Sequence, residues 1–374
     1  MKRRTTLLLA VAALIGAPPA ASAPPQVQAR AYLVQNAATG EVLASRNASK
    51  PLPIASITKL MTVLVTLDRA SPDDVVTVTR GAAAIGESTI YLQAGERIEV
   101  GDLIRAALVQ SANDAATALA AHVGGGSVER FVGLMNAKAR ALGLRDTHFE
   151  NPDGLDTPGH VSSARDVTRL ARIAMRNPFV RSTVRLETAT IAGGRLLHTW
   201  NDLLAAFPRT IGVKTGHTDD AGWSEVAAAQ GRGTTIYATI LGSQSREQRN
   251  ADLERLLAWG LARYRVVPAV STGRVYATAM APYGLEPVRL VARRSLLRVV
   301  RLGRPLVEQV VAPTAVVLPV HAGQRLGEVR ILSRGTVVAV APLVAAEARE
   351  RPGALVRARF YARRTLHHLK GLIA

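Results

Sequence analysis

Predicted strands at both ends of residues 24–263, with helices between them, constrain the fold more than any other feature of this sequence. Near the start, Arg30–Asn36 and Glu41–Arg46 flank Ala-Ala-Thr-Gly and predict a β-hairpin. Near the end, Ile211–Gly216, Trp223–Ala229 and Thr234–Leu241 predict three more strands. We therefore expect an α/β (α+β) fold, with an antiparallel sheet assembled from the two ends of one domain and flanked by helices.

Apolar residues at helical spacing predict the helices of this domain. Ser56–Asp68 is predicted to be amphipathic, with one buried face. An Ala-rich stretch, Asp102–Val123, is predicted to be helical. The other expected helices are Val128–Leu142, Ala164–Met175 and Glu247–Arg263.

Residues 1–23 have the layout of a secretory signal peptide. Lys2, Arg3 and Arg4 precede the apolar run Leu7–Ala17, and small residues follow. We expect cleavage after Ser22 or Ala23; an uncleaved N-terminal anchor is the alternative. An exported chain is expected at the periplasmic or extracellular face of the cytoplasmic membrane.

Charge divides the rest of the chain unevenly. Residues 24–263 hold 26 basic and 23 acidic side chains, a net of +3, whereas residues 264–374 hold 18 and 5, a net of +13. The basic part is therefore the candidate for docking onto an anionic surface, and export argues against nucleic acid as the partner. The chain has no cysteine, which excludes disulfides, thiolate metal sites and a cysteine nucleophile.

The first candidate catalytic pair is Ser56 and Lys59, three residues apart at the start of a predicted helix. Such residues lie on one helix face, within reach of each other. A serine hydroxyl needs an adjacent base, and a lysine serves as one if its pKa is lowered. The chain has 41 arginines and only six lysines, and arginine cannot deprotonate. The alternative makes Ser56 a helix N-cap and Lys59 a solvated side chain.

Two further motifs follow. Ser111-Ala112-Asn113 offers polar groups that could instead cap the next helix. Lys214-Thr215-Gly216, at the end of a predicted strand, offers a cation, a hydroxyl and a glycine that together could bind a carboxylate; an ordinary turn is the alternative. In this order the three motifs match the set found in penicillin-binding proteins and serine β-lactamases.

The sequence resembles the D-alanyl-D-alanine carboxypeptidases, the low-molecular-mass penicillin-binding proteins, from about Ala31 to Ala345. Blocks around the three motifs match, as do Ser162-Ser163-Ala164-Arg165-Asp166 and the spacing of Arg249. Asp153 departs from the family's Asn-Pro-His-Gly-Leu block, where His is usual. We expect this departure to affect substrate details rather than catalysis.

The resemblance implies a role for each candidate residue. Ser56 would be the acylated nucleophile and Lys59 its base, while Ser111 and Asn113 would relay protons and hold the substrate amide. Lys214 would bridge the serine cluster and the substrate carboxylate. The remaining implied roles are carboxylate binding by Thr215 and Arg249, an oxyanion hole made by the backbone N–H groups of Ser56 and His217, and strand-edge scaffolding by Gly216.

The implied reaction is removal of the terminal D-alanine from peptidoglycan stem pentapeptides, without a metal or organic cofactor. Penicillins and other β-lactams would acylate the same serine. An endopeptidase, a transpeptidase or a weak β-lactamase could use the same residues, although the glutamate that a class A β-lactamase needs is missing between Ser111 and Lys214. A non-catalytic wall- or membrane-binding protein is the alternative from another class.

The C-terminal part suggests two further modules. Short β-branched runs punctuated by Gly and Pro predict a small β-rich domain over residues 264–350, which resembles the family's stalk domain. Residues 351–374 hold six basic and no acidic residues, with apolar residues at helical spacing. They predict an amphipathic helix on an anionic membrane surface; a helix packed on the domain or a solvated basic tail is the alternative.

Overall fold

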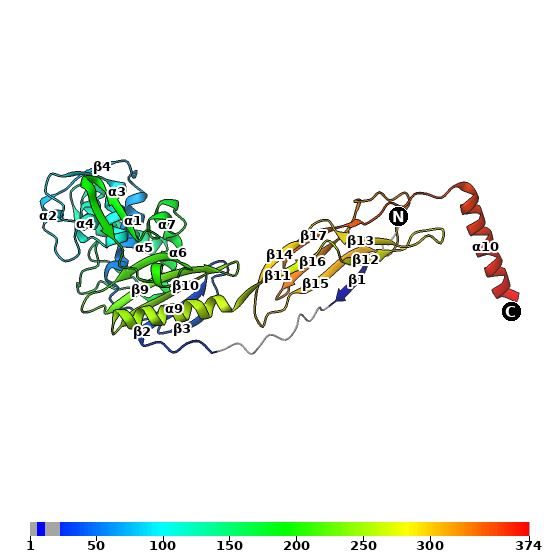
Figure 1. The fold of residues 1–374 in the computed structure, drawn as a ribbon, viewed down its shortest axis with the longest axis horizontal. Helices are drawn as coiled ribbons and strands as arrows, with labels where there is room; N and C mark the ends of the chain where they lie inside the picture. The colour runs from blue at the N-terminus through cyan, green and yellow to red at the C-terminus, as the bar shows by residue number, and fades with distance from the viewer. Residues whose placement is uncertain (1–5, 12–22, 374) are drawn as a thin grey trace. The chain divides into compact units, whose positions relative to one another are not determined.

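The structure is a computed structural model of the 374-residue chain that describes residues 6–11 and 23–373, and for residues 6–11 and 367–373 only the backbone. The described chain forms two compact units (Figure 1). Residues 23–263 form the first unit, and residues 264–373 form the second together with residues 6–11. Each unit has a hydrophobic core of its own.

The first unit is built on a five-stranded sheet of order β3-β2-β10-β9-β8. All neighbouring strands are antiparallel; Ala238, for example, lies between Val34 and Ala227. The bounds are β2 Ala29–Asn36, β3 Val42–Arg46, β8 Thr210–Gly216, β9 Trp223–Gly231 and β10 Thr234–Ser243. The prediction of an antiparallel sheet assembled from both ends of this unit is confirmed.

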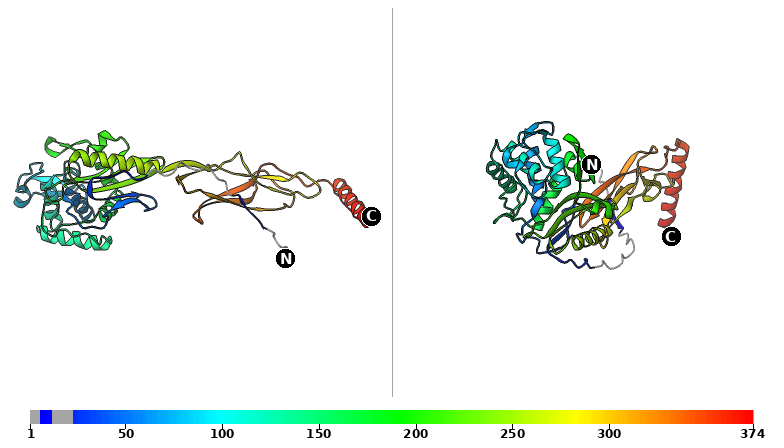
Figure 2. Two further views of the ribbon diagram at one scale, coloured as in Figure 1. Left: turned by 90° about the horizontal axis from the view of Figure 1, so that it is seen from below. Right: turned by 60° about the vertical axis from the view of Figure 1, so that its left-hand side comes forward.

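Helices cover both faces of this sheet (Figure 2). Helix α9 (Arg246–Ala262) packs Gly260 against Ile236 of β10. Helix α6 (Ala164–Ala174) places the Thr168 hydroxyl 2.6 Å from that of Thr239, also in β10. Residues three apart in a strand point to opposite faces, so the two helices lie on opposite sides of the sheet.

The other helices and short strands of this unit lie between β3 and β8. The helical segments are η1 Ala55–Thr58, α1 Lys59–Leu67, α2 Arg80–Ala83, α3 Val100–Arg105, η2 Ala106–Gln110, α4 Asn113–Val123, α5 Val128–Ala141, α7 Pro178–Thr183, η3 Ala192–Gly194 and α8 Leu203–Ala206. The short strands are β4 Val75–Thr77, β5 Arg97–Glu99, β6 Thr188–Ile191 and β7 Arg195–His198.

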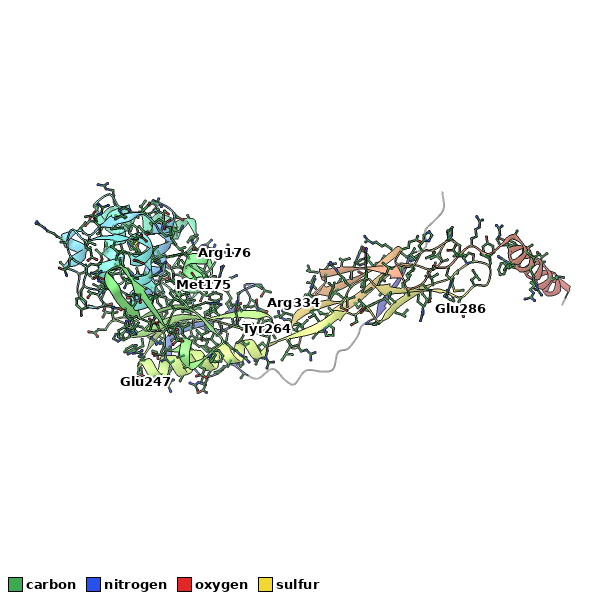
Figure 3. The ribbon with its side chains drawn as sticks, turned by 45° about the horizontal axis from the view of Figure 1, so that its top comes forward. Met175, Arg176, Glu247, Tyr264, Glu286 and Arg334 are labelled. Atoms are coloured by element: carbon green, nitrogen blue, oxygen red, sulfur yellow. The ribbon has the colours of Figure 1, made fainter. Side chains whose placement is uncertain are left out.

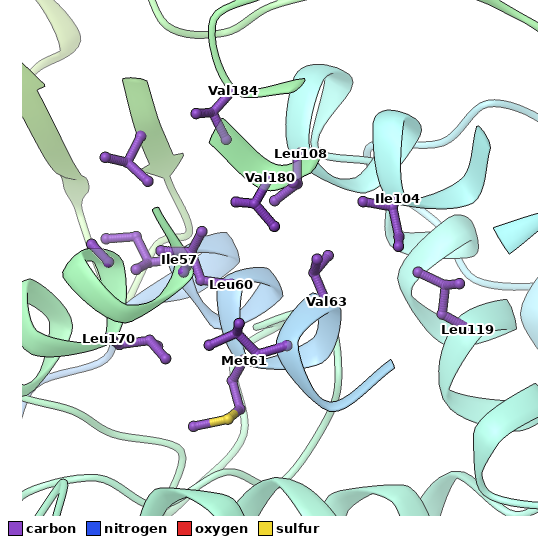
Figure 4. Close-up of a cluster of buried hydrophobic side chains, with 14 of the residues drawn as sticks. Ile57, Leu60, Met61, Val63, Ile104, Leu108, Leu119, Leu170, Val180 and Val184 are labelled. Atoms are coloured by element: carbon purple, nitrogen blue, oxygen red, sulfur yellow. The ribbon is translucent and has the colours of Figure 1, made fainter. Parts of the chain in front are cut away.

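Helix α1 is buried on all sides, and the prediction that it buries one face is wrong. Every residue from Lys59 to Thr66 is buried. Figure 4 shows Leu60, Met61 and Val63 of α1 among apolar side chains of several other helices. The apolar spacing identified the helix, but the surrounding elements also cover the face that carries Lys59, Thr62 and Thr66.

The predicted helical segment Asp102–Val123 is interrupted, and its continuity is corrected here. Helix α3 ends at Arg105, residues Ala106–Gln110 form the π-helix η2, and Ser111 adopts a left-handed conformation with φ 65°. The neighbouring segment stabilises the break, because Ser88 Oγ donates to the Gln110 carbonyl and the Asn113 N–H donates to the Ser88 carbonyl. Apolar residues lie on both sides of the break, so helical spacing alone does not reveal it.

The second unit is rich in β-structure, as predicted. Its larger sheet has the order β1-β15-β16-β17-β13-β12, and β11 pairs with β14 in a separate ribbon. Tyr264, labelled in Figure 3, is the first residue of β11. The bounds are β11 Tyr264–Val270, β12 Val275–Ala279, β13 Val288–Ala292, β14 Leu296–Arg301, β15 Val307–Pro313, β16 Arg325–Ser333 and β17 Thr336–Ala345.

Strand β1 (Thr6–Val11) pairs antiparallel with β15, so that Leu8 lies opposite Val311. This strand falls within the predicted signal peptide, of which residues 1–5 and 12–22 lie outside the described residues. The structure is that of the uncleaved chain, and the signal peptide stays a prediction.

Helix α10 (Ala354–Ile373) confirms the predicted C-terminal helix. Near its middle, Phe360 and Tyr361 contact the ring of Tyr283 edge-on, with ring centroids 6.0 Å apart in each case. Apolar side chains elsewhere on the helix, such as Leu355 and Leu366, are exposed, and the side chains beyond residue 366 lie outside those described. Among the described helices, none is both long and apolar enough to cross a membrane.

Candidate active site

A cavity of about 240 Å³ in the first unit lies where η1 meets the end of β8. Seven of the nine predicted site residues line it, from Ser56 in η1 to Arg249 in α9. The lining residues are Ser56, Glu87, Ser88, Ser111, Asn113, Gly154, Leu155, Trp200, Thr215, Gly216, His217, Thr218, Trp223, Arg246 and Arg249. Lys59 and Lys214 lie beneath the lining and are hydrogen-bonded to it.

The predicted catalytic pair is in direct contact. Lys59 Nζ donates to Ser56 Oγ at 2.6 Å. Ser56 lies in the 3₁₀ turn η1, and Lys59 is the first residue of α1, so the backbone brings the two side chains together within one turn. The alternative of a solvated Lys59 is wrong, because this side chain is fully buried.

Lys59 has two further acceptors. Its Nζ donates to Asn113 Oδ1 at 2.6 Å and to the backbone carbonyl of Asp153 at 2.8 Å. Burial lowers the pKa of Lys59 to about 8, while the negative charges of Asp153, Glu87 and Asp114 oppose that shift. An amine with this pKa is neutral in about a tenth of molecules at pH 7.

The other two motifs meet at a second lysine. Lys214 Nζ, on β8, donates to Ser111 Oγ at 2.9 Å and to the backbone carbonyl of Thr215 at the same distance. The pKa of Lys214 is held well below its usual value, first by burial and then by the positive charge of Lys59. The pKa values of both lysines at the site are thus lowered.

The alternative, in which Ser111 and Asn113 cap a helix, is wrong. Ser111 ends η2 in its left-handed conformation, and Ala112 occupies the N-cap position of α4. The amide of Asn113 bridges two elements, because Nδ2 donates to the Gly86 carbonyl at 3.2 Å while Oδ1 accepts from Lys59. The left-handed turn at Ser111 thus directs both side chains into the site.

Gly216 is needed for the close approach of β8 to η1. A Cβ atom there would lie 2.7 Å from the Ile54 carbonyl oxygen and 3.2 Å from the backbone nitrogen of Ser56. The next residue, His217, stacks on Trp223 with ring centroids 4.0 Å apart. Thr215, Gly216 and His217 therefore form the edge of the cavity beside Ser56.

Arg249 lines the cavity, as predicted, but it also has a buried partner that the sequence analysis missed. Its Nε lies 3.1 Å from a carboxylate oxygen of Glu225 on β9, and both side chains are almost completely buried. Arg249 also donates to Asn250 Oδ1. Burial raises the pKa of Glu225, and the guanidinium of Arg249 opposes that shift.

Other residues of the site also escaped the sequence analysis. Trp200 lines the cavity, and its indole N–H donates to the Gln110 carbonyl at 2.9 Å. Glu87 and Ser88 line it as well. Only Glu225 left a signal in the sequence: it is an acidic residue inside a predicted strand that is otherwise almost entirely apolar.

Asp153, where the sequence departs from the family's motif, lies next to Lys59. Its backbone carbonyl accepts from Lys59 Nζ, and its side chain is buried. The expectation that this departure affects substrate details rather than catalysis stays a prediction. Within the described residues, no group of three or more His, Asp or Glu side chains is arranged to hold a metal ion.

This geometry is typical of a class of protein: the active-site serine hydrolases and acyltransferases in which a buried lysine, rather than a histidine, contacts the serine. A family model described as D-alanyl-D-alanine carboxypeptidase matches residues 18–245. D-alanyl-D-alanine carboxypeptidase DacD of Salmonella typhimurium is 33% identical over 343 residues, which cover 87% of each chain. DacA of Escherichia coli is 34% identical over 276 residues, covering 70% of this chain and 67% of that protein.

Solved structures are also similar. Penicillin-binding protein 6B from Escherichia coli has a TM-score of 0.63 at 32% identity, covering 88% of this chain and 98% of that one. The Streptomyces K15 DD-transpeptidase has a TM-score of 0.61 at 32% identity, covering 64% of this chain and 100% of that one. The chain belongs to the D-alanyl-D-alanine carboxypeptidase family. The predictions of this family, of its fold class and of a serine-type carboxypeptidase are confirmed.

Proposed function

We propose that the protein removes the terminal D-alanine from peptidoglycan stem pentapeptides through an acyl-enzyme on Ser56. The observation that carries the proposal is the contact between Ser56 Oγ and the buried amine of Lys59. The hydroxyl attacks the carbonyl carbon of the D-Ala–D-Ala peptide bond while Lys59 accepts its proton. D-Alanine leaves, and water then hydrolyses the ester to release the shortened peptide and regenerate Ser56.

The acceptors around Lys59 fix the direction of proton transfer. A neutral amine has two N–H groups and one lone pair. The Asn113 Oδ1 and the Asp153 carbonyl only accept hydrogen bonds, so they hold the two N–H groups. The lone pair then points toward Ser56 Oγ, the remaining partner, which is the orientation that a base requires.

In this proposal the second lysine, Lys214, helps to protonate the amine of the departing D-alanine. Lys214 donates to Ser111 Oγ, and Ser111 lines the cavity. The proton on its way to the leaving amine passes through the hydroxyl of Ser111, and the positive charge of Lys214 favours the substrate carboxylate. Asn113 has its side-chain amide at the cavity wall, where it holds the substrate amide.

Thr215 and Arg249 bind the terminal carboxylate of the substrate in this proposal. Both line the same cavity, and an arginine suits a carboxylate because its planar N–H groups match the two oxygens. The backbone N–H groups of Ser56 and His217 stabilise the oxyanion that develops during attack. Both residues lie at the cavity edge, on either side of Gly216.

The experiment is D-alanine release from a diacylated Lys-D-Ala-D-Ala peptide, measured for the mature protein and for Ser56→Ala. Ser182→Ala is the matched control, because that hydroxyl lies on α7 and donates to the Phe179 carbonyl outside the cavity. We expect release by the protein and by the control variant, and loss in Ser56→Ala. Release that persists in Ser56→Ala would mean that another residue is the nucleophile.

Transfer to an amine acceptor is the second candidate, because one similar structure is named a DD-transpeptidase. Adding glycine or a diamino acid to the same assay separates the two activities: a transpeptidase forms the new peptide, whereas a carboxypeptidase releases the shortened peptide. A fluorescent penicillin that labels the protein but not Ser56→Ala would support either enzyme over a non-catalytic binding protein.

In our proposal, the rest of the chain directs export and holds the catalytic domain near the cell wall. Residues 1–23 are the signal peptide, residues 24–263 the catalytic domain and residues 264–350 a β-rich stalk. Residues 351–374 bind the anionic surface of the cytoplasmic membrane, on its periplasmic or extracellular side. The exposed arginines and apolar side chains of α10 support this last step, since a helix of that composition binds at a charged lipid interface.

A further inference from the structure

The loop Asn151–Asp156 forms one wall of the space around Lys59. Helix α1 holds it from one side, because Thr62 Oγ1 donates to the Pro152 carbonyl at 2.5 Å and Lys59 donates to the Asp153 carbonyl. On the other side, Thr218 Oγ1 donates to Asp156 Oδ1 at 2.6 Å. The loop is therefore fixed between the helix that carries the base and the segment that follows β8.

The side chain of Asp153 is buried inside this arrangement, with 3% of its surface exposed. Its Oδ1 accepts from the Leu155 N–H at 3.0 Å and its Oδ2 from Thr117 Oγ1 of α4 at 3.3 Å. The first bond closes a tight turn within the loop, and the second ties the loop to α4. Together they hold the Asp153 carbonyl where Lys59 donates to it.

The same side chain brings a negative charge close to the base. Several charged groups face Lys59: Asp153 from the loop, Asp114 from α4, Glu87 from the segment before Ser88, and Lys214 from β8. Of the three carboxylates, Asp153 has the largest effect in opposing the lowered pKa of Lys59. Asp114 accepts from three backbone N–H groups, those of Ile90, Leu92 and Ala115, and these bonds offset part of its charge.

We propose that Asp153 is a positioning residue for Lys59: its carboxylate fixes the loop carbonyl that accepts from Nζ, and its negative charge stabilises the protonated amine. The charge therefore sets the pH at which Lys59 becomes a base. This inference rests on the proposed role of Lys59 and adds a residue that tunes it. A neutral side chain at position 153 gives a site that is active at lower pH.

The test compares the pH dependence of acylation by a fluorescent penicillin in the full-length protein and in Asp153→Asn. Asparagine keeps the size of the side chain and an oxygen that accepts from the Leu155 N–H, but it removes the charge. Without the charge, Lys59 loses its proton at lower pH, so the acid limb of the rate profile moves to lower pH. A shift of half a pH unit makes the variant about threefold faster on the acid limb and leaves the plateau nearly unchanged.

Asp156→Asn is the matched control, because it removes the same charge from the same loop at a residue that does not contact Lys59. Its acid limb should coincide with that of the unsubstituted protein. Asp153→Ala, which removes both the charge and the two hydrogen bonds, should shift the limb and also lower the plateau. Circular dichroism checks that each variant is folded.

Each outcome has a separate meaning. If the acid limb of the pH–rate profile is unchanged in Asp153→Asn, or moves to higher pH, this inference is overturned while the role of Ser56 stays intact. Absence of a Ser56-dependent acylation in the unsubstituted protein would instead contradict the proposed function. A shift of equal size in Asp156→Asn would show that the effect belongs to the charge of the whole loop and not to Asp153.

Discussion

The Nε atom of Arg249 lies 3.1 Å from a carboxylate oxygen of Glu225, and the two side chains are 2% and 0% exposed. Among the described groups, none donates a well-aligned hydrogen bond to either carboxylate oxygen of Glu225. In register, Glu225 lies opposite Thr215 on β8. Glu225 therefore lies next to both Arg249 and Thr215, the two residues that bind the substrate carboxylate in our proposal.

Removing Glu225 alone should destabilise the fold. Glu225→Ala leaves the guanidinium of Arg249 buried without its main counter-charge, which costs about 3 kcal/mol in the free energy of unfolding. Urea denaturation followed by circular dichroism measures this loss. The double variant Glu225→Met with Arg249→Met should lose less than Glu225→Ala, because it removes both charges and fills the space. Equal losses would show that the charge pair is not the cause.

The acid limb of the activity profile should report Lys59. With a pKa of about 8 and a base that acts only when neutral, kcat/KM should fall by about tenfold for each pH unit below that pKa and reach a plateau above it. Lys59→Arg should show no measurable acylation by penicillin at any pH between 6 and 9, since arginine stays protonated there. Acylation at a normal rate by this variant would exclude Lys59 as the base.

Gly216→Ala should impair acylation without removing any proposed catalytic group. The added methyl would meet the Ile54 carbonyl oxygen at 2.7 Å and push β8 away from the turn that carries Ser56. A displacement of about 1 Å between reacting groups can cost about 100-fold in rate. The matched control is Gly133→Ala on the exposed face of α5, where a Cβ meets nothing within 4 Å; its acylation rate should be unchanged.

Deleting residues 351–374 should release the mature protein from membranes and leave D-alanine release from soluble peptides unchanged. Sedimentation with vesicles of anionic or neutral lipid measures the binding directly. We expect the intact protein to bind anionic vesicles in a salt-dependent manner, because the described part of α10 carries four arginines and no acidic residue. Unchanged membrane fractionation of the shortened protein would exclude this helix as the anchor.

The parts of this structure that the sequence predicted are those with a local signal. Short, largely apolar runs identified β8, β9 and β10, and the spacing of Ser56 and Lys59 placed two side chains within one turn of each other. The meeting of Lys214 with Ser111, 103 residues earlier in the chain, has no local signal. It followed only from the resemblance to a known family.

The missed features depend on contacts between distant segments. Nothing near Asp153 in the sequence shows that α1 and α4 close around it, and no pattern links Glu225 to Arg249 in the next helix. The interruption at Ser111 was missed for a similar reason, because the Ser88 segment supplies the hydrogen bonds that stabilise it. Periodicity describes which face of an element is apolar, and it carries no information about which polar partner arrives from elsewhere.

The π-helix η2 makes the winding of one short segment a requirement of the site. A π-helical turn holds one residue more than an α-helical turn. If Ala106–Gln110 were wound as ordinary α-helix, the same five residues would carry each later residue about 100° further around the axis. Ser111 and Asn113 would then turn away from Lys214 and Lys59. The wide turn at η2 therefore sets the direction in which these two side chains point.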